Sequence, residues 1–155
     1  LLFREAAARG LWSVTAGPIG FSAAWLAFDP AGMSFDEYFD LRDDMEVVDQ
    51  LVAFAVGLTP RATHLTYTDL TQVDLSSGAG PSASLACQLA SGVLAAEVLK
   101  ALTCPTGVRA APYYHQFDAW RCKLRSGVLR RGNRSLMQRI KRRLLKRRLK
   151  QIGLC

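Results

Sequence analysis

The chain has 155 residues and is 50% hydrophobic, so it is long enough to bury one hydrophobic core. Its net charge of +7 is unevenly distributed. All 13 acidic residues precede Arg121 with only six of the 20 basic ones, whereas 121–155 holds fourteen basic residues and no acidic one. This asymmetry predicts an acidic body followed by a basic interaction tail.

The cysteine pattern argues against a zinc site. The four cysteines, Cys87, Cys104, Cys122 and Cys155, include no CxxC pair. We expect free thiols in a reducing compartment, with Cys87 as a small core residue. The chain starts without a signal-peptide pattern, so we expect a cytoplasmic protein. It begins at Leu1 inside a predicted helix, which suggests a piece of a longer polypeptide.

The first elements predict the αβ half of a crossover unit. Residues 1–9 are helix-like, Gly10 ends that helix, and residues 11–16 form an apolar strand. A helix joined to a strand through one glycine favours a parallel sheet. A second strand is predicted at 23–28, and Asp29-Pro30-Ala31-Gly32 ends it.

Between these strands lies the motif Gly17-Pro18-Ile19-Gly20. We expect a turn there, beyond the carboxyl end of the first strand, where ligands collect in open α/β sheets. Gly17 and Gly20 are therefore candidates for cofactor binding. The motif is only GxxG, and Pro18 lacks an amide that a phosphate could use. A simple tight turn is the alternative.

Acidic and aromatic residues alternate in 33–45, where Ser34 and Glu37 resemble a capping box. The acids could form a metal or acid/base cluster: Asp36, Glu37, Asp40, Asp43 and Asp44. We favour a solvated helix face above Phe35, Tyr38, Phe39 and Leu41, because no histidine or fixed ligand spacing accompanies them. An amphipathic helix follows over 46–58, with its apolar face at Val47, Val48, Leu51, Phe54, Ala55 and Leu58.

An irregular stretch over 62–76 is anchored by Tyr67, Leu70 and Val73. The longest apolar segment then runs from Pro81 to Leu102 and predicts a helix that is covered on more than one side. A membrane span is the alternative, but small and polar residues interrupt the segment. Glu97 and Lys100 are spaced as an ion pair on that helix.

Edge strands are predicted at 108–111 and 113–120, and 122–125 continues the pattern. Neither of the two histidines lies in a recognisable catalytic motif. His115 lies three residues before Asp118, but no GxSxG motif supplies a nucleophile, so we favour a hydrogen-bonded strand histidine. His64 lies in a polar loop without a visible partner.

The last helix is predicted from about Ser135 to Ile152. Leu136, Met137, Ile140 and Leu144 share one side, and Leu145, Leu149 and Ile152 drift onto the next. Its candidate interaction residues are Arg139, Arg142, Arg143, Lys146 and Arg147. Such a helix can bind an acidic membrane, nucleic acid or an acidic protein surface, or it can fold back on its own acidic body.

Three blocks of sequence together resemble one family. Residues 12–28, followed by 29–35, are similar to the second half of the ThiF/MoeB-type adenylating domain, whose superfamily includes the ubiquitin-activating enzymes. The run Ala96-Glu97-Val98-Leu99-Lys100 resembles the end of the helix after the crossover segment of that family. Residues 109–121 and Gly132-Asn133-Arg134 resemble a bacterial branch of ThiF-family adenylyltransferases.

The resemblance implies a Rossmann-like fold that binds ATP and Mg and adenylates the C-terminal carboxylate of a ubiquitin-like or sulfur-carrier protein. The residues that hold ATP and Mg belong to the N-terminal half of that domain. The catalytic residues of this chain therefore remain unknown, and the chain alone should be inactive. The paired CxxC zinc site found in many members is absent.

We therefore expect an α/β fold: the C-terminal half of a Rossmann-like mixed sheet over 1–125, with a buried central helix, and a basic helical tail over 126–155. A homodimer is expected. The alternative function is a non-enzymatic α/β scaffold that presents the basic helix to membrane or nucleic acid.

Overall fold

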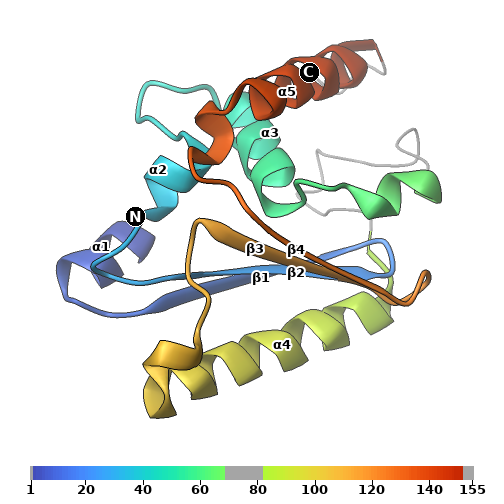
Figure 1. Cartoon of the computed structure of the whole chain (residues 1–155). Helices are drawn as coiled ribbons and strands as arrows, with labels where there is room; N and C mark the ends of the chain where they lie inside the picture. The colour runs from blue at the N-terminus through green and yellow to red at the C-terminus, as the bar shows by residue number, and fades with distance from the viewer. Residues whose placement is uncertain (1, 69–81, 152–155) are drawn as a thin grey trace.

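The structure is a computed structural model that describes residues 2–68 and 82–151, and it is a mixed α/β fold (Figure 1). A four-stranded antiparallel sheet has the strand order β1-β2-β3-β4. Helix α4 (Ser84–Thr103) covers one face of the sheet, while α3 (Val47–Leu58) and α5 (Leu136–Gln151) lie over the other. The predicted α/β class is confirmed. The predicted anchors Leu70 and Val73 lie outside the described residues.

The predicted parallel sheet is wrong for the described strands. Helix α1 (Leu2–Ala8) ends before Gly10, which has a φ of +68° as a helix-ending glycine should. Strands β1 (Ser13–Ile19) and β2 (Ser22–Phe28) then pair antiparallel through every residue. Only two residues join them, and a parallel pair needs a connection of a dozen or more.

The second half of the sheet is also a hairpin. Strand β3 (Tyr113–Asp118) pairs antiparallel with β2 on one side and with β4 (Lys123–Val128) on the other. It is therefore an inner strand and not the predicted edge strand. Residues 108–111 are not a strand; they follow the short helix η4 (Pro105–Gly107) and lead into a cis Ala111-Pro112 bond.

The core lies between the sheet and the helices above it. Helix α2 (Phe35–Phe39) begins with the predicted cap, in which the Ser34 hydroxyl accepts a hydrogen bond from the Glu37 amide. Tyr38 and Phe39 are fully buried against Phe28 of β2. The prediction that aromatic side chains lie beneath the acidic face of this helix is confirmed.

Helix α3 is present, and its buried face agrees only in part with the predicted one: Leu58 is buried and Phe54 packs against the core. Val47 and Leu51 are 71% and 50% exposed, whereas Val52, Ala53 and Val56 are buried. This helix is apolar on most sides, so spacing alone did not select the face that packs. Contact with α5 buries the side that the prediction left out.

Helix α4 is not the buried helix that the sequence predicts. Only Ala86, Ala90 and Glu97 are buried, and they face strands β1 and β2. Large apolar side chains face away from the sheet and are exposed: Leu85, Val98, Leu99 and Leu102. Cys87 is exposed too, contrary to the prediction of a core thiol. By length and composition alone, α4 is the one helix in the described ranges that could cross a membrane.

Helix α5 folds back on the acidic body, which is one of the four expected arrangements. It packs against α3 and is preceded by the short helix η5 (Gly132–Arg134). It docks through the side that carries Gln138 and Leu149, both buried. The predicted apolar side is exposed: Leu136, Met137, Ile140 and Leu144.

Candidate functional site

The β1–β2 hairpin turns at Gly20 and Phe21, three residues later than the predicted turn. Gly20 has a φ of +58°, which suits a hairpin turn with glycine first. Its carbonyl accepts a hydrogen bond from the Ala83 amide at 2.9 Å, and it forms a parallel bridge with Ser82. The start of α4 is thus attached to the hairpin tip.

Gly17 lies inside β1, paired with Ala24, and not in a turn. A Cβ atom at this position would be 2.5 Å from Cδ2 of Leu58, the buried last residue of α3. A close strand–helix approach therefore accounts for Gly17. The described geometry gives it no phosphate cradle.

We expect Gly17→Ala to destabilise the fold by about 1–3 kcal/mol, because the added Cβ forces the buried Leu58 side chain to shift. Gly92→Ala is the matched control: this glycine is exposed on α4 with nothing within 4 Å of its added Cβ. That change should stabilise the fold by about 0.5–1 kcal/mol. Urea denaturation measures both. Equal stability of Gly17→Ala and the parent would contradict the packing explanation.

A cluster of buried polar residues lies beside the hairpin tip. Ser22, Gln116 and Asp118 are fully buried, and His64 is 7% exposed. Ser22 and Asp118 are cross-strand partners on β2 and β3. We call the following set the polar cluster: Ser22, His64, Tyr67, Thr68, Gln116 and Asp118.

The polar cluster is held by a few hydrogen bonds. The Tyr67 hydroxyl is 3.1 Å from the Ser22 hydroxyl. Gln116 donates through Nε2 to the Thr63 hydroxyl at 2.8 Å, and Asp118 accepts through Oδ1 from the Arg121 amide at 3.1 Å. The first two join η1 (Thr63–Thr66) and Tyr67, which follows it, to strands β2 and β3.

Four buried atoms of the polar cluster have no hydrogen-bond partner among the residues that the structure describes: His64 Nδ1, Thr68 Oγ1, Gln116 Oε1 and Asp118 Oδ2. Such an atom costs about 1–3 kcal/mol, so several together in one place need an explanation. Two of them, the amide oxygen of Gln116 and the carboxylate oxygen of Asp118, can only accept. Both residues are fully buried, so a group that offers N–H or O–H donors would reach these atoms only after the cluster is uncovered.

Burial sets the protonation of this cluster. It lowers the pKa of His64 to about 4, although the nearby Asp118 carboxylate acts in the opposite direction. Burial also raises the pKa of Tyr67, and Asp118 adds to that rise. At neutral pH the imidazole is uncharged and the phenol keeps its proton, so both rings are neutral hydrogen-bonding groups.

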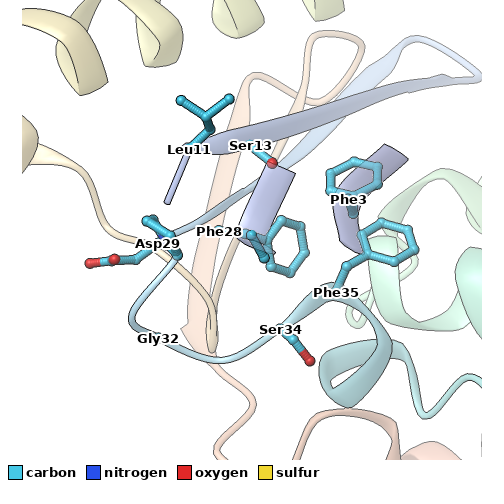
Figure 2. A pocket seen from close by; sticks show the side chains of 10 residues that line it. Phe3, Leu11, Ser13, Phe28, Asp29, Gly32, Ser34 and Phe35 are labelled. Atoms are coloured by element: carbon cyan, nitrogen blue, oxygen red, sulfur yellow. The ribbon is translucent and has the colours of Figure 1, made fainter. Parts of the chain in front are cut away.

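Two cavities lie away from the polar cluster. One of about 30 Å³ lies between α1, the start of β1 and the turn after β2, where Figure 2 shows Phe3, Phe28 and Phe35 around it. That volume holds about one water molecule and excludes a substrate. A groove of about 280 Å³ beside it contains Arg4, whose guanidinium pairs with Asp36 and Asp43.

Four of the five acids of 33–45 are in ion pairs, and none is arranged with other ligands as a metal cluster among the described residues. Asp36 and Asp43 pair with Arg4, and Asp44 pairs with Arg42. Asp40 pairs with Arg134 and, at 2.9 Å, with Arg142 of α5. Within residues 2–68 and 82–151, no three His, Cys, Asp or Glu side chains are placed to hold a metal ion.

His115 is the hydrogen-bonded strand histidine that the sequence favours. Its Nδ1 is 2.8 Å from the Ser126 hydroxyl, and its ring stacks on Trp25 at 5.2 Å. Trp25 donates through Nε1 to Glu97, which also forms the predicted ion pair with Lys100 at 2.6 Å. Burial lowers the pKa of His115. These contacts attach α4 to the sheet.

The five candidate residues of the tail divide into two groups. Arg142 and Lys146 turn inward and pair with Asp40 and Asp49, the latter at 2.5 Å. Arg139, Arg143 and Arg147 lie on the exposed side of α5. Two of the five thus attach the helix to the body, and three remain available at the surface.

The polar cluster could not be found from the sequence. Its members come from three separate stretches, and none has a diagnostic motif. One signal was present: strand β3 carries Gln116 and Asp118 at alternate positions, which puts both on one face of the sheet. Two polar residues on the inward face of a strand indicate a polar site or a network.

No known protein family matches this chain by its family model, and no curated protein matches it significantly. A functional assignment therefore depends on the residues and the geometry described above.

Proposed function

We propose that this chain is the C-terminal part of a ThiF/MoeB-type adenylyltransferase, which activates the C-terminal carboxylate of a ubiquitin-like or sulfur-carrier protein. The order of its elements supports this proposal. A strand, a glycine hairpin, an antiparallel strand and a Pro-Gly turn are followed by the long helix α4 with its Ala-Glu-Val-Leu-Lys end. This is the order that the resemblance implies for the second half of that domain.

The observation that carries the proposal is the open side of the fold. Helix α4 exposes Leu99 and Leu102 at 62% and 79%, and β1 is an edge strand with a neighbour on one side only among the described strands. Exposed apolar faces and long open edges are costly in a free-standing domain. An N-terminal half that continues the sheet and covers α4 would remove both.

Gly17 is packed against Leu58, and no acidic group in the described ranges is arranged for a metal. The proposal therefore assigns nucleotide and metal binding to the upstream half of the domain. Homodimer formation and a cytoplasmic location belong to the same proposal.

The polar cluster and the hairpin tip are assigned to the wall of the carrier site. A carrier tail that ends in Gly-Gly is extended and offers peptide N–H groups. The unpartnered acceptors of Gln116 and Asp118 are fully buried, and they are suited to such donors if the hairpin tip moves away and uncovers them. Thr68 and Ser82 lie near Gly20 at the edge of this cluster.

The test uses the polypeptide that carries both halves. We expect pyrophosphate exchange into ATP that depends on a carrier protein ending in Gly-Gly. Asp118→Asn should lower carrier-dependent exchange by about tenfold, since a hydrogen bond to a charged acceptor is worth roughly 1.5–3 kcal/mol. Ser126→Ala, on the opposite face of the sheet, is the control and should leave exchange unchanged.

Two outcomes would overturn the proposal. One is the absence of exchange in a folded sample of the longer protein with every carrier tried. The other is adenylate formation by the isolated chain, because the proposal assigns nucleotide binding to the upstream half of the domain.

A further inference from the structure

Helix α5 presents an unusual face to solvent. Four large apolar side chains on it are exposed: Leu136 at 74%, Met137 at 61%, Ile140 at 41% and Leu144 at 54%. At 100° per residue these four residues share one side of the helix. Basic residues lie beside and between them, and all are exposed: Arg139, Arg143, Arg147, Arg148 and Lys150.

The docking of α5 does not use this face. The buried residues Gln138 and Leu149 lie on the opposite side, where the Gln138 amide donates to the Val56 carbonyl at 3.0 Å. Lys141 donates to the Pro60 carbonyl at 2.7 Å from the same side. The helix is therefore fixed on the body with its amphipathic face outward, along the top of the molecule in Figure 1.

The charge of this face is of one sign. No acidic residue occurs after Arg121, and the body carboxylates that reach α5 pair with Arg142 and Lys146 on the docked side. An anionic surface would therefore contact five basic residues of α5, and no acidic residue on the same helix would repel it. Each basic residue close to an anionic bilayer raises the partition coefficient of a protein from water onto the membrane by about fivefold.

The exposed apolar residues decide between a lipid and a nucleic acid. Nucleic-acid affinity comes mainly from contacts of basic residues with phosphates, which require no apolar stripe. Helix α5 also has no aromatic residue on which a base could stack. A helix that lies in a bilayer interface needs an apolar side to insert and a basic border to meet the headgroups.

We propose that the outward face of α5 binds the surface of an anionic phospholipid membrane. Leu136, Met137, Ile140 and Leu144 enter the boundary between headgroups and acyl chains. Arg139, Arg143 and Arg147 contact the lipid phosphates from the border. This inference does not rest on the proposed adenylation, since it involves neither the sheet nor the polar cluster.

The test is co-sedimentation of the full chain with phosphatidylcholine vesicles that contain or lack phosphatidylserine. We expect binding that requires phosphatidylserine and weakens with added salt. The double variant Ile140→Gln/Leu144→Gln should bind about tenfold or more weakly, because it removes two apolar anchors. Arg143→Gln/Arg147→Gln should bind roughly 25-fold more weakly, as two charges are lost.

The matched control is Lys123→Gln/Arg125→Gln. It removes the same charge from β4, where both side chains are exposed, and should retain binding. Circular dichroism and thermal unfolding establish that each variant keeps the fold. This is expected because the replaced α5 side chains face solvent.

Three results would overturn the inference. The first is the absence of binding to either vesicle. The second is binding that survives both α5 variants, which would assign it to another surface such as the apolar face of α4. The third is salt-dependent binding to a DNA duplex that Ile140→Gln/Leu144→Gln leaves unchanged, without vesicle binding, which would assign the face to nucleic acid. Carrier-dependent exchange is scored separately, so the two proposals fail independently.

Discussion

Asn133→Asp should destabilise the protein by about 3–5 kcal/mol, enough to unfold a marginally stable domain. Asn133 is fully buried between α2, α3 and α5. Its Nδ2 atom donates to the carbonyls of Phe39 at 3.0 Å and Ala53 at 2.7 Å. An aspartate has nearly the same shape but would point a buried carboxylate oxygen at two carbonyl oxygens.

The position of Asn133 leaves no room for the change to relax. A Cβ atom on the preceding Gly132, which has a φ of +49°, would collide with the backbone of Tyr38. A Cβ atom on Gly57 would be 2.6 Å from the Phe39 ring and 3.1 Å from Asn133 Nδ2. The backbone around this amide is therefore closely packed on two sides.

Urea denaturation of the parent and the variant measures this effect. Gln88→Glu is the matched control, since it makes the same amide-to-carboxylate change on the exposed side of α4 and should shift stability by at most about 0.5 kcal/mol. Near-parental stability of Asn133→Asp would contradict the hydrogen bonds assigned to this amide. It would also remove the proposed reason for the Gly132-Asn133 pair.

Local signals predicted most element positions correctly. The Ser34 cap, the glycine after α1, the turn at 29–32 and the length of α5 each depend on residues a few positions apart. The same signals suggested the family resemblance through the Gly132-Asn133 pair. In the structure Gly132 packs against the backbone of Tyr38, and Asn133 hydrogen-bonds to the Phe39 carbonyl. The same pair would serve this packing in a domain of any family.

The errors concern which neighbour covers which face. A helix followed by one glycine and a strand predicts a crossover unit. The two-residue turn at Gly20 instead makes β2 the antiparallel partner of β1. Helices α3 and α4 are apolar on most sides, so their periodicity could not select a buried face. In α5, Gln138 docks with the body and Ile140 faces solvent. Specific hydrogen bonds to α3 outweighed the hydrophobic pattern there.

The polar cluster was beyond sequence reasoning for a related reason. Its residues meet because β3 inserts between β2 and β4 after the 20 residues of α4. His64 could be read only as a loop residue without a partner. Its fold environment makes it a buried neutral imidazole beside Asp118.

That environment makes His64 the main source of acid sensitivity that we expect in this protein. Its pKa is about 4 in the folded state, below the ordinary value of 6.5 that applies when the chain unfolds. Between these two values the unfolded chain binds more protons than the folded one, so stability falls as the pH falls. The contribution of His64 is fully present above pH 6.5 and is lost progressively towards pH 4.

From pH 7 to pH 4 this linkage should remove about 3 kcal/mol of unfolding free energy. His64→Gln should flatten the pH dependence by that amount, whatever its effect on stability at neutral pH. His115→Gln is the control for histidine titration on the other face of the sheet, and its effect should be smaller because that ring is only partly buried. Urea midpoints across this pH range give the comparison. An unchanged pH slope in His64→Gln would mean that the imidazole is solvated in the folded protein, and the polar cluster would then be open to water instead of closed beneath the hairpin.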